Sequence, residues 1–173
     1  MKWILALISL FFMQEPSVIF KPNSGARWFV VDDVVMGGMS DGRVTYMDDG
    51  LLHFYGLVST ANNGGFSSIR MRPGSVELEK VEAFEIKLKG DGKPFQFRVK
   101  SDEYQRYSYA YTFETSGEWE VIRIPFEEME ATFRGMKVNV PPYPGERIEE
   151  VAFLIGNKKN ESFDLKVERI EVR

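Results

Sequence analysis

Residues 84–89 read Phe84-Glu85-Ile86-Lys87-Leu88-Lys89, with an apolar side chain at every second position. Successive side chains of a β-strand point to opposite faces, so this alternation predicts a strand with one face on the core and one in water. Residues 95–100 and 163–167 repeat the pattern, which is typical of antiparallel sheets. Residues 151–155 are apolar on both faces and are predicted to lie in the centre of a sheet.

Turn residues separate these segments at the spacing of a β-sandwich. Gly37-Gly38, Asp49-Gly50 and Ser116-Gly117 are among the pairs that accept positive φ angles at little cost. No long segment keeps the 3.6-residue period of a helix, and residues 125–129 are expected to form one helical turn at most. We therefore predict an all-β chain, a single antiparallel β-sandwich of about ten strands.

The first fourteen residues differ from the rest of the chain. Lys2 precedes an apolar run over residues 3–13 that only Ser9 interrupts. A basic start followed by a short apolar run is typical of a secretory signal peptide, and the run is too short to span a membrane. We expect residues 1–14 to be a leader and residues 15–173 to be the domain, exported to the periplasm or the outside if the leader is cleaved. The alternative is a buried N-terminal strand.

Composition excludes several classes of site. The 173 residues include no cysteine and one histidine, His53, which excludes disulfides, thiolate nucleophiles and sites with two imidazole ligands. The net charge of −4 lacks the basic excess of a general nucleic-acid binder. A catalytic histidine needs a nucleophile and an orienting acid, which the sequence does not reveal, so we expect His53 to be a hydrogen-bonded or solvent-facing residue. No cofactor or metal is predicted.

Two glycine-containing segments are the main candidates for a binding site. The first predicts a strand that ends in a Gly-Gly turn, with Asp33 and Ser40 bonding the backbone N–H groups of the turn. The second predicts a β-hairpin, with one strand ending at Ser59 and another returning over residues 66–72. The candidate residues in the two segments are Asp33, Met36, Gly37, Gly38, Ser40, Asn63, Gly64, Gly65, Phe66, Ser68 and Arg70.

Each of these candidates also has a structural interpretation. Asn63-Gly64-Gly65 either lines a cleft through exposed N–H groups or is a turn that only such residues tolerate. Asp33 and Arg70 either recognise a ligand or form a salt bridge with each other. Arg70 and Arg72 lie two positions apart and should share a face of their strand.

Aromatic residues alternate over residues 107–113. Tyr107, Tyr109 and Tyr111 fall on one face of the predicted strand. Such a stripe either stacks sugar rings or receives a partner on an open sheet face, or it fills the core.

These segments resemble the complex I intermediate-associated protein 30 family, whose fold is similar to galactose-binding-like jelly rolls. The resemblance extends over about residues 17–173 and lies in Trp28, Asp33, Val35-Met36-Gly37-Gly38, Ser40, Phe54, Gly56, Asn63-Gly64-Gly65-Phe66, Ser68, Arg70, Lys89-Gly90-Asp91-Gly92, Trp119, Ile124-Pro125-Phe126, Phe133-Arg134-Gly135 and Ile155-Gly156. Eukaryotic members look like assembly chaperones of respiratory complex I, which hold intermediates without catalysing a reaction.

Three functional hypotheses follow. The first, favoured by the resemblance, is a non-enzymatic module that binds a protein partner, such as a subunit of a membrane complex. The second is a carbohydrate-binding module that uses the tyrosine face. The third is an enzyme acting through Asp33, Asp91 and Arg70.

Overall fold

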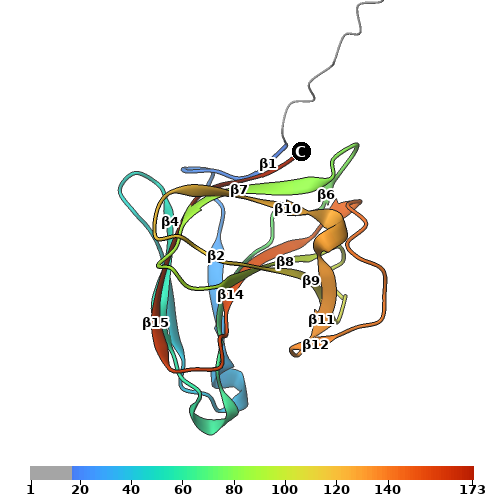
Figure 1. Ribbon diagram of the computed structural model, residues 1–173. Coiled ribbons are helices and arrows are strands. Elements are labelled where there is room, and N and C mark those ends of the chain that lie inside the picture. The colour runs from blue at the N-terminus through green and yellow to red at the C-terminus, as the bar shows by residue number, and fades with distance from the viewer. Residues whose placement is uncertain (1–16) are drawn as a thin grey trace, which may run out of the picture.

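The computed structural model describes residues 17–173 and consists of two antiparallel β-sheets packed face to face (Figure 1). The expected leader over residues 1–14, and its alternative as a buried strand, lie outside the described residues. The alternation of the sequence has the predicted effect, because the apolar members of each strand meet between the sheets. Phe54, Phe84, Phe97 and Phe153, from both sheets, are fully buried there.

The first sheet, which we call sheet A, has the strand order β10-β7-β15-β4-β3, and β1 also pairs with β15. Its strands are β1 (Ser17–Phe20), β3 (Asp41–Tyr46), β4 (Leu52–Val58), β7 (Ala83–Lys89), β10 (Glu120–Pro125) and β15 (Glu161–Val172). The outer face of this sheet carries the polar half of the alternation, such as Glu85, Lys87 and Lys89 of β7.

The second sheet, sheet B, has the order β12-β11-β9-β8-β14-β5-β2. Its strands are β2 (Trp28–Asp32), β5 (Ser67–Met71), β8 (Phe95–Lys100), β9 (Ser108–Phe113), β11 (Glu130–Phe133), β12 (Met136–Lys137) and β14 (Glu150–Ile155). β14 lies between β5 and β8, which confirms the central position predicted for residues 151–155. A separate short ladder joins β6 (Val76–Glu77) to β13 (Arg147–Ile148).

The all-β prediction is confirmed, but the predicted number of about ten strands is too low. Residues 17–173 form fifteen strands, because short pieces at the sheet edges, such as β6, β12 and β13 with two residues each, carry no readable alternation. The helical segments are three 3-10 turns, η1 (Asp33–Met36), η2 (Ala61–Asn63) and η3 (Phe126–Glu128), of which the third was predicted. None of the helices in the described part is long and apolar enough to cross a membrane.

The predicted hairpin, with one strand ending at Ser59 and another returning over residues 66–72, is wrong. β4 pairs with β3 and β15 in sheet A, whereas β5 pairs with β14 and β2 in sheet B. Residues 59–66 therefore cross from one sheet to the other. Asn62 and Asn63 do adopt the left-handed conformation expected of a turn, with φ angles of 55° and 61°. Eight residues are long enough to bridge facing sheets, which pack about 10 Å apart, so the same turn residues serve a crossover.

The loops of interest and the C-terminus lie at opposite ends of the sandwich. Figure 1 shows η1 and the crossover loop together at one end, and the C-terminus at the opposite end. The last residue is held in the structure, since the Arg173 backbone exchanges hydrogen bonds of 2.9 Å with Ala83 in both directions.

Candidate functional site

The Asp33 carboxylate joins the two glycine-containing loops. Its Oδ1 accepts the Ser40 N–H at 3.1 Å and its Oδ2 accepts the Ser40 hydroxyl at 2.6 Å. The same Oδ2 accepts backbone N–H groups from the crossover loop, Gly65 at 2.6 Å and Phe66 at 3.2 Å. The Ser40 hydroxyl oxygen in turn accepts the Ser59 N–H at 3.0 Å. Asp33 and Ser40 do accept backbone N–H groups, but the prediction placed these in the Gly-Gly turn, and three of the four donors, Ser59, Gly65 and Phe66, belong to the other segment.

Two of the candidate glycines leave room for this carboxylate. A Cβ atom on Gly38 would lie 2.2 Å from Asp33 Oδ1, and one on Gly64 would lie 2.5 Å from Oδ2. Gly37 differs, because a Cβ atom there would meet no atom within 4 Å, and its φ angle of 87° is the reason for glycine at this position. The motif glycines therefore serve the packing of Asp33 and the turn beside it.

The four hydrogen bonds outweigh the effect of burial on Asp33. The side chain is fully buried, and desolvation by itself would raise the pKa of its carboxyl group. The Ser40 hydroxyl and the N–H groups of Gly65, Ser40 and Phe66 stabilise the ionised form, so the pKa is lowered overall. Asp33 is consequently ionised and anchors the two loops, and its two carboxylate oxygens accept hydrogen bonds from groups within the protein.

Asp32 makes a second tie that the sequence interpretation missed. Its Oδ2 accepts the Gly42 N–H at 2.8 Å and its Oδ1 accepts the Ser67 hydroxyl at 2.5 Å, which links β2 to the starts of β3 and β5. The sequence signal for this role of Asp32 was its position next to Asp33, shortly before the Gly-Gly turn. Adjacent residues of an extended chain point in opposite directions, so each carboxylate serves a different set of donors.

The salt bridge between Asp33 and Arg70, one of the two alternatives for this pair, is not formed. Arg70 Nη1 lies 3.4 Å from Oε1 of Glu150, and Arg72 Nε lies 3.1 Å from Oε2 of the same carboxylate. Arg70 and Arg72 do share the outer face of sheet B, as predicted. The reason for the different partner is that Asp33 is enclosed at the loop end, while the register places Arg70 beside Ala152 of β14, two residues from Glu150.

Ser68 and the tyrosine stripe are engaged in contacts within the protein. Ser68 is buried and donates its hydroxyl proton to the Val31 carbonyl at 2.6 Å. Tyr109 is 7% exposed, and Tyr107 and Tyr111 are partly buried against the core. Desolvation raises the pKa of Tyr109 to about 12, with a further contribution from its hydrogen bond to Tyr107. Of the interpretations left open, core packing is the one observed, so the stripe is not an open platform for sugar rings.

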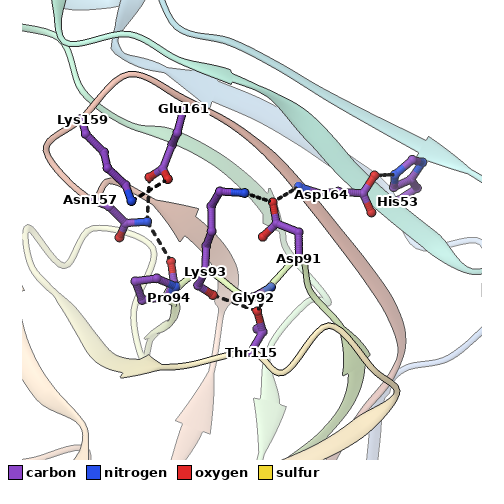
Figure 2. A network of polar contacts seen from close by, with 10 residues as sticks. All are labelled: His53, Asp91, Gly92, Lys93, Pro94, Thr115, Asn157, Lys159, Glu161 and Asp164. Atoms are coloured by element: carbon purple, nitrogen blue, oxygen red, sulfur yellow. Dashed lines mark hydrogen bonds and ion pairs between the residues drawn. The ribbon is translucent and has the colours of Figure 1, made fainter.

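His53 belongs to a polar network on sheet A (Figure 2). Its Nε2 lies 2.7 Å from Oδ2 of Asp164, and its ring stacks on Tyr55 with 4.4 Å between ring centroids. Asp164 is the orienting acid that the sequence did not reveal. The signal was the alternation of residues 163–167, which places Asp164 on the outer face of β15 beside β4. Within residues 17–173, His53 has no hydroxyl group as a hydrogen-bond partner, so no activated nucleophile accompanies it.

Asp91 closes the edge of the same network. Its Oδ2 accepts the Asp164 N–H at 3.2 Å and pairs with the Lys93 ammonium group (Figure 2). The carboxylate thus supplies an acceptor to a backbone N–H of β15 beyond the end of β7. A Cβ atom on the neighbouring Gly90 would lie 2.5 Å from Thr115. Packing against Thr115 thus explains Gly90, whereas Gly92 is explained by its φ angle of 85°, because a Cβ atom there would meet no atom within 4 Å.

The residues of the enzyme hypothesis do not form one site. Asp33 is enclosed between the loops, Arg70 lies with Glu150 on sheet B, and Asp91 lies with Lys93 on sheet A. No group of three or more His, Asp or Glu side chains that could hold a metal ion is present in the described range.

Exposed apolar side chains surround the Asp33 tie. We call Val34, Met36, Met39 and Leu57 the loop-end patch; they are 60%, 56%, 64% and 57% exposed. Leu57 belongs with the loop because it pairs in register with Asp41, two residues after Met39. Of the predicted site residues, Met36 is therefore the one that presents an apolar side chain to solvent beside the two loops.

The comparison with protein families agrees with this arrangement. The family model "Complex I intermediate-associated protein 30 (CIA30)" matches residues 18–167. The chain belongs to the CIA30 family. The resemblance expected from the glycine motifs is confirmed, and the motif residues of this CIA30 chain are now placed: Asp33, Gly38, Ser40, Gly64 and Gly65 at the loop tie, and Asp91 at the edge of sheet A.

Relatives of this CIA30 domain are found by sequence and by structure. The chain is 30% identical over 131 residues to uncharacterized protein C9E9.15 of Schizosaccharomyces pombe, which covers 65% of the chain and 60% of that protein. A family 11 carbohydrate-binding module of the cellulosomal cellulase Lic26A-Cel5E of Clostridium thermocellum superposes with a TM-score of 0.61 at 14% identity, over 91% of this chain and 94% of that one. An Arg-to-Ala variant of the family 29 carbohydrate-binding module CBM29-2 gives 0.59 at 10% identity, over 92% of each chain. At such identities these modules show the fold alone.

Proposed function

We propose that this CIA30 domain is a non-catalytic protein-binding module that holds an intermediate in the assembly of a multi-subunit complex. The single observation that carries the proposal is the loop-end patch: three exposed apolar side chains on η1 and the loop after it, which a buried carboxylate fixes in place, and Leu57 at the end of β4. The family description, an association with complex I intermediates, supports a protein as the partner.

The chemistry of the patch favours a partner protein whose own apolar interface is still exposed, because the other subunits of its complex have not yet bound. Methionine side chains adapt to irregular apolar surfaces because they are unbranched and polarizable. The tie at Asp33 lowers the conformational entropy that the loops would lose on binding, which favours association. An assembly intermediate exposes apolar surface that the finished complex buries, and is thus complementary to such a patch.

The compartment follows from the leader that the sequence predicts. If residues 1–14 direct export, the partner is a complex of the cell envelope or a secreted protein. N-terminal sequencing of the protein recovered from the exported fraction tests this, and a chain that starts at Met1 in the cytoplasmic fraction would contradict it.

A double replacement on the patch tests the binding function. We expect M36S/M39S to weaken capture of the partner by about thirtyfold to several hundredfold, because each of the two buried methionines contributes about 1–2 kcal/mol of apolar transfer free energy. The measurement is quantitative crosslinking in the native host, followed by mass spectrometry.

The matched control is M136S, since Met136 is 67% exposed and lies on β12, at the edge of sheet B. A partner that is lost from M36S/M39S and retained by M136S supports the proposal. Equal loss from both variants, or no reproducible partner of the unaltered chain, would contradict it.

A further inference from the structure

A row of residues crosses the outer face of sheet B and leaves a hollow. The register aligns Arg70 of β5 with Ala152 of β14, Ala152 with Arg98 of β8, and Arg98 with Ala110 of β9. Ala152 stands between Arg70 and Arg98 and is too small to fill the space between these longer side chains. A shallow pocket opens there, and Lys100 and Ser108 are also among the residues that line it.

The charges in this hollow are not balanced. Arg98 donates from Nε at 3.0 Å and from Nη2 at 2.7 Å, and both bonds go to the neutral amide oxygen of Gln96. Over residues 17–173, no carboxylate lies within 4 Å of the cationic groups of Arg98 or Lys100. Glu150 is the acid of the hollow, and it is shared between Arg70 and Arg72. The hollow therefore carries a local excess of cations, although the whole chain has a net charge of −4.

Arg98 is held where its charge is unfavourable. Desolvation lowers the pKa of its guanidinium group, and the nearby positive charge of Arg70 lowers it further. Arginine stays protonated in proteins, so the charge remains and its environment lacks a counter-charge. An anion placed between Arg70 and Arg98 would relieve both effects.

We propose that this hollow, the Arg98 hollow, binds the oxyanion of a small ligand, a carboxylate or a phosphate group. Nη1 of Arg98 has no acceptor in the described part of the chain, and the planar guanidinium is suited to the two oxygens of such a group. The Ser108 hydroxyl and the Lys100 ammonium group supply further donors, whereas the Ser68 hydroxyl is already bonded to Val31.

The lining argues for a charged group over a neutral sugar. Sugar rings are commonly held by stacking on aromatic side chains, and none of the residues that line the hollow is aromatic. The site is separate from the loop-end patch, because the hollow lies on the outer face of sheet B, whereas the patch lies on η1, the loop after it and the end of β4 in sheet A. The domain would accordingly carry two separate binding surfaces.

A titration of the full chain with defined anions tests the proposal. Inorganic phosphate and D-galacturonate are the two probes, at constant ionic strength, and galactose is the neutral counterpart of galacturonate. Binding is followed by the arginine Nε–H signals in ¹H–¹⁵N spectra. We expect saturable binding of at least one anion and none of galactose, and a loss of about tenfold or more in R98Q, because a charge-assisted hydrogen bond contributes about 1.5–3 kcal/mol.

Two further variants complete the design. R123Q is the control, because Arg123 lies on sheet A and already pairs with Glu82 and Glu85. The R123Q variant should bind the anion with the same affinity as the unaltered chain. A152L fills the hollow without removing a charge and should also abolish binding, which keeps the test valid if R98Q does not fold. Binding of phosphate alone identifies a phosphate-bearing ligand, and binding of galacturonate alone identifies a sugar acid. Absence of saturable binding of either anion, or equal affinity in R98Q and R123Q, would overturn the proposal.

Discussion

Replacement of Asp33 by asparagine should lower the free energy of unfolding at pH 7 by about 3–5 kcal/mol. The carboxylate accepts four hydrogen bonds in a buried position. An asparagine amide presents an NH₂ group to donors that need an acceptor, and each stranded buried donor costs about 1–3 kcal/mol. Urea denaturation followed by tryptophan fluorescence measures the difference.

The pH dependence of that difference gives an independent test. The hydrogen bonds lower the pKa of Asp33 in the folded state below its ordinary value of 3.8. The stabilisation is therefore fully present above the unfolded-state pKa, and it is lost as the pH falls through the lower folded-state pKa. We expect the two proteins to differ most at neutral pH and to converge in acid, below about pH 4.

D41N is the matched control for this variant. Asp41 is 60% exposed and forms a surface pair with Arg43, so its replacement should change the free energy of unfolding by about 0–1 kcal/mol. A difference between D33N and the unaltered chain as small as that of D41N, or one that persists unchanged in acid, would show that Asp33 is not the anchor of the loops.

Replacement of Gly38 by alanine should cost about 3 kcal/mol or more of unfolding free energy. The new Cβ would lie 2.2 Å from Asp33 Oδ1, so the carboxylate or the loop must move and the hydrogen bonds of the tie are lost. Gly37 provides the comparison within the same turn. Its Cβ would meet no atom within 4 Å, and its φ angle of 87° leads to an expected cost of about 1–2 kcal/mol for G37A.

A double-mutant cycle separates the steric cause from a general weakness of the turn. In an Asp33→Ala background the carboxylate is absent, so G38A should have little further effect, while G37A should cost the same as in the unaltered chain. Thermal and urea unfolding of the six proteins give the coupling energies. Additive effects of D33A and G38A would contradict the assignment of that glycine to Asp33.

The strands could be predicted from the sequence because burial on one face leaves a period of two. The assignment of strands to sheets could not, since the alternation of β4 in sheet A and that of β5 in sheet B read alike. The turn residues at Asn62 and Asn63 were identified correctly, but a turn conformation does not indicate whether the chain returns to the same sheet.

The candidate site shows the same division. Asp33 was identified from its place before a Gly-Gly turn, whereas its partners Gly65 and Phe66 lie 32 and 33 residues away. Arg70 was identified from its motif, but its partner Glu150 is 80 residues distant and depends on the register of β14 against β5. The orientation of the tyrosine stripe and the cluster around Arg98 depend on tertiary packing. The alternation of the sequence does not show which strands become neighbours or which face of a strand the core covers.

The position of Arg173 has a practical consequence for measuring any interaction of the loops. Its backbone is locked to Ala83 at the end of the sandwich opposite η1 and the crossover loop (Figure 1). A biotinylated linker fused after this residue would attach the protein to a biosensor chip with Met36 and Met39 directed away from the matrix. Immobilisation through random lysines would instead engage Lys100, which lines the Arg98 hollow, and would obscure that surface.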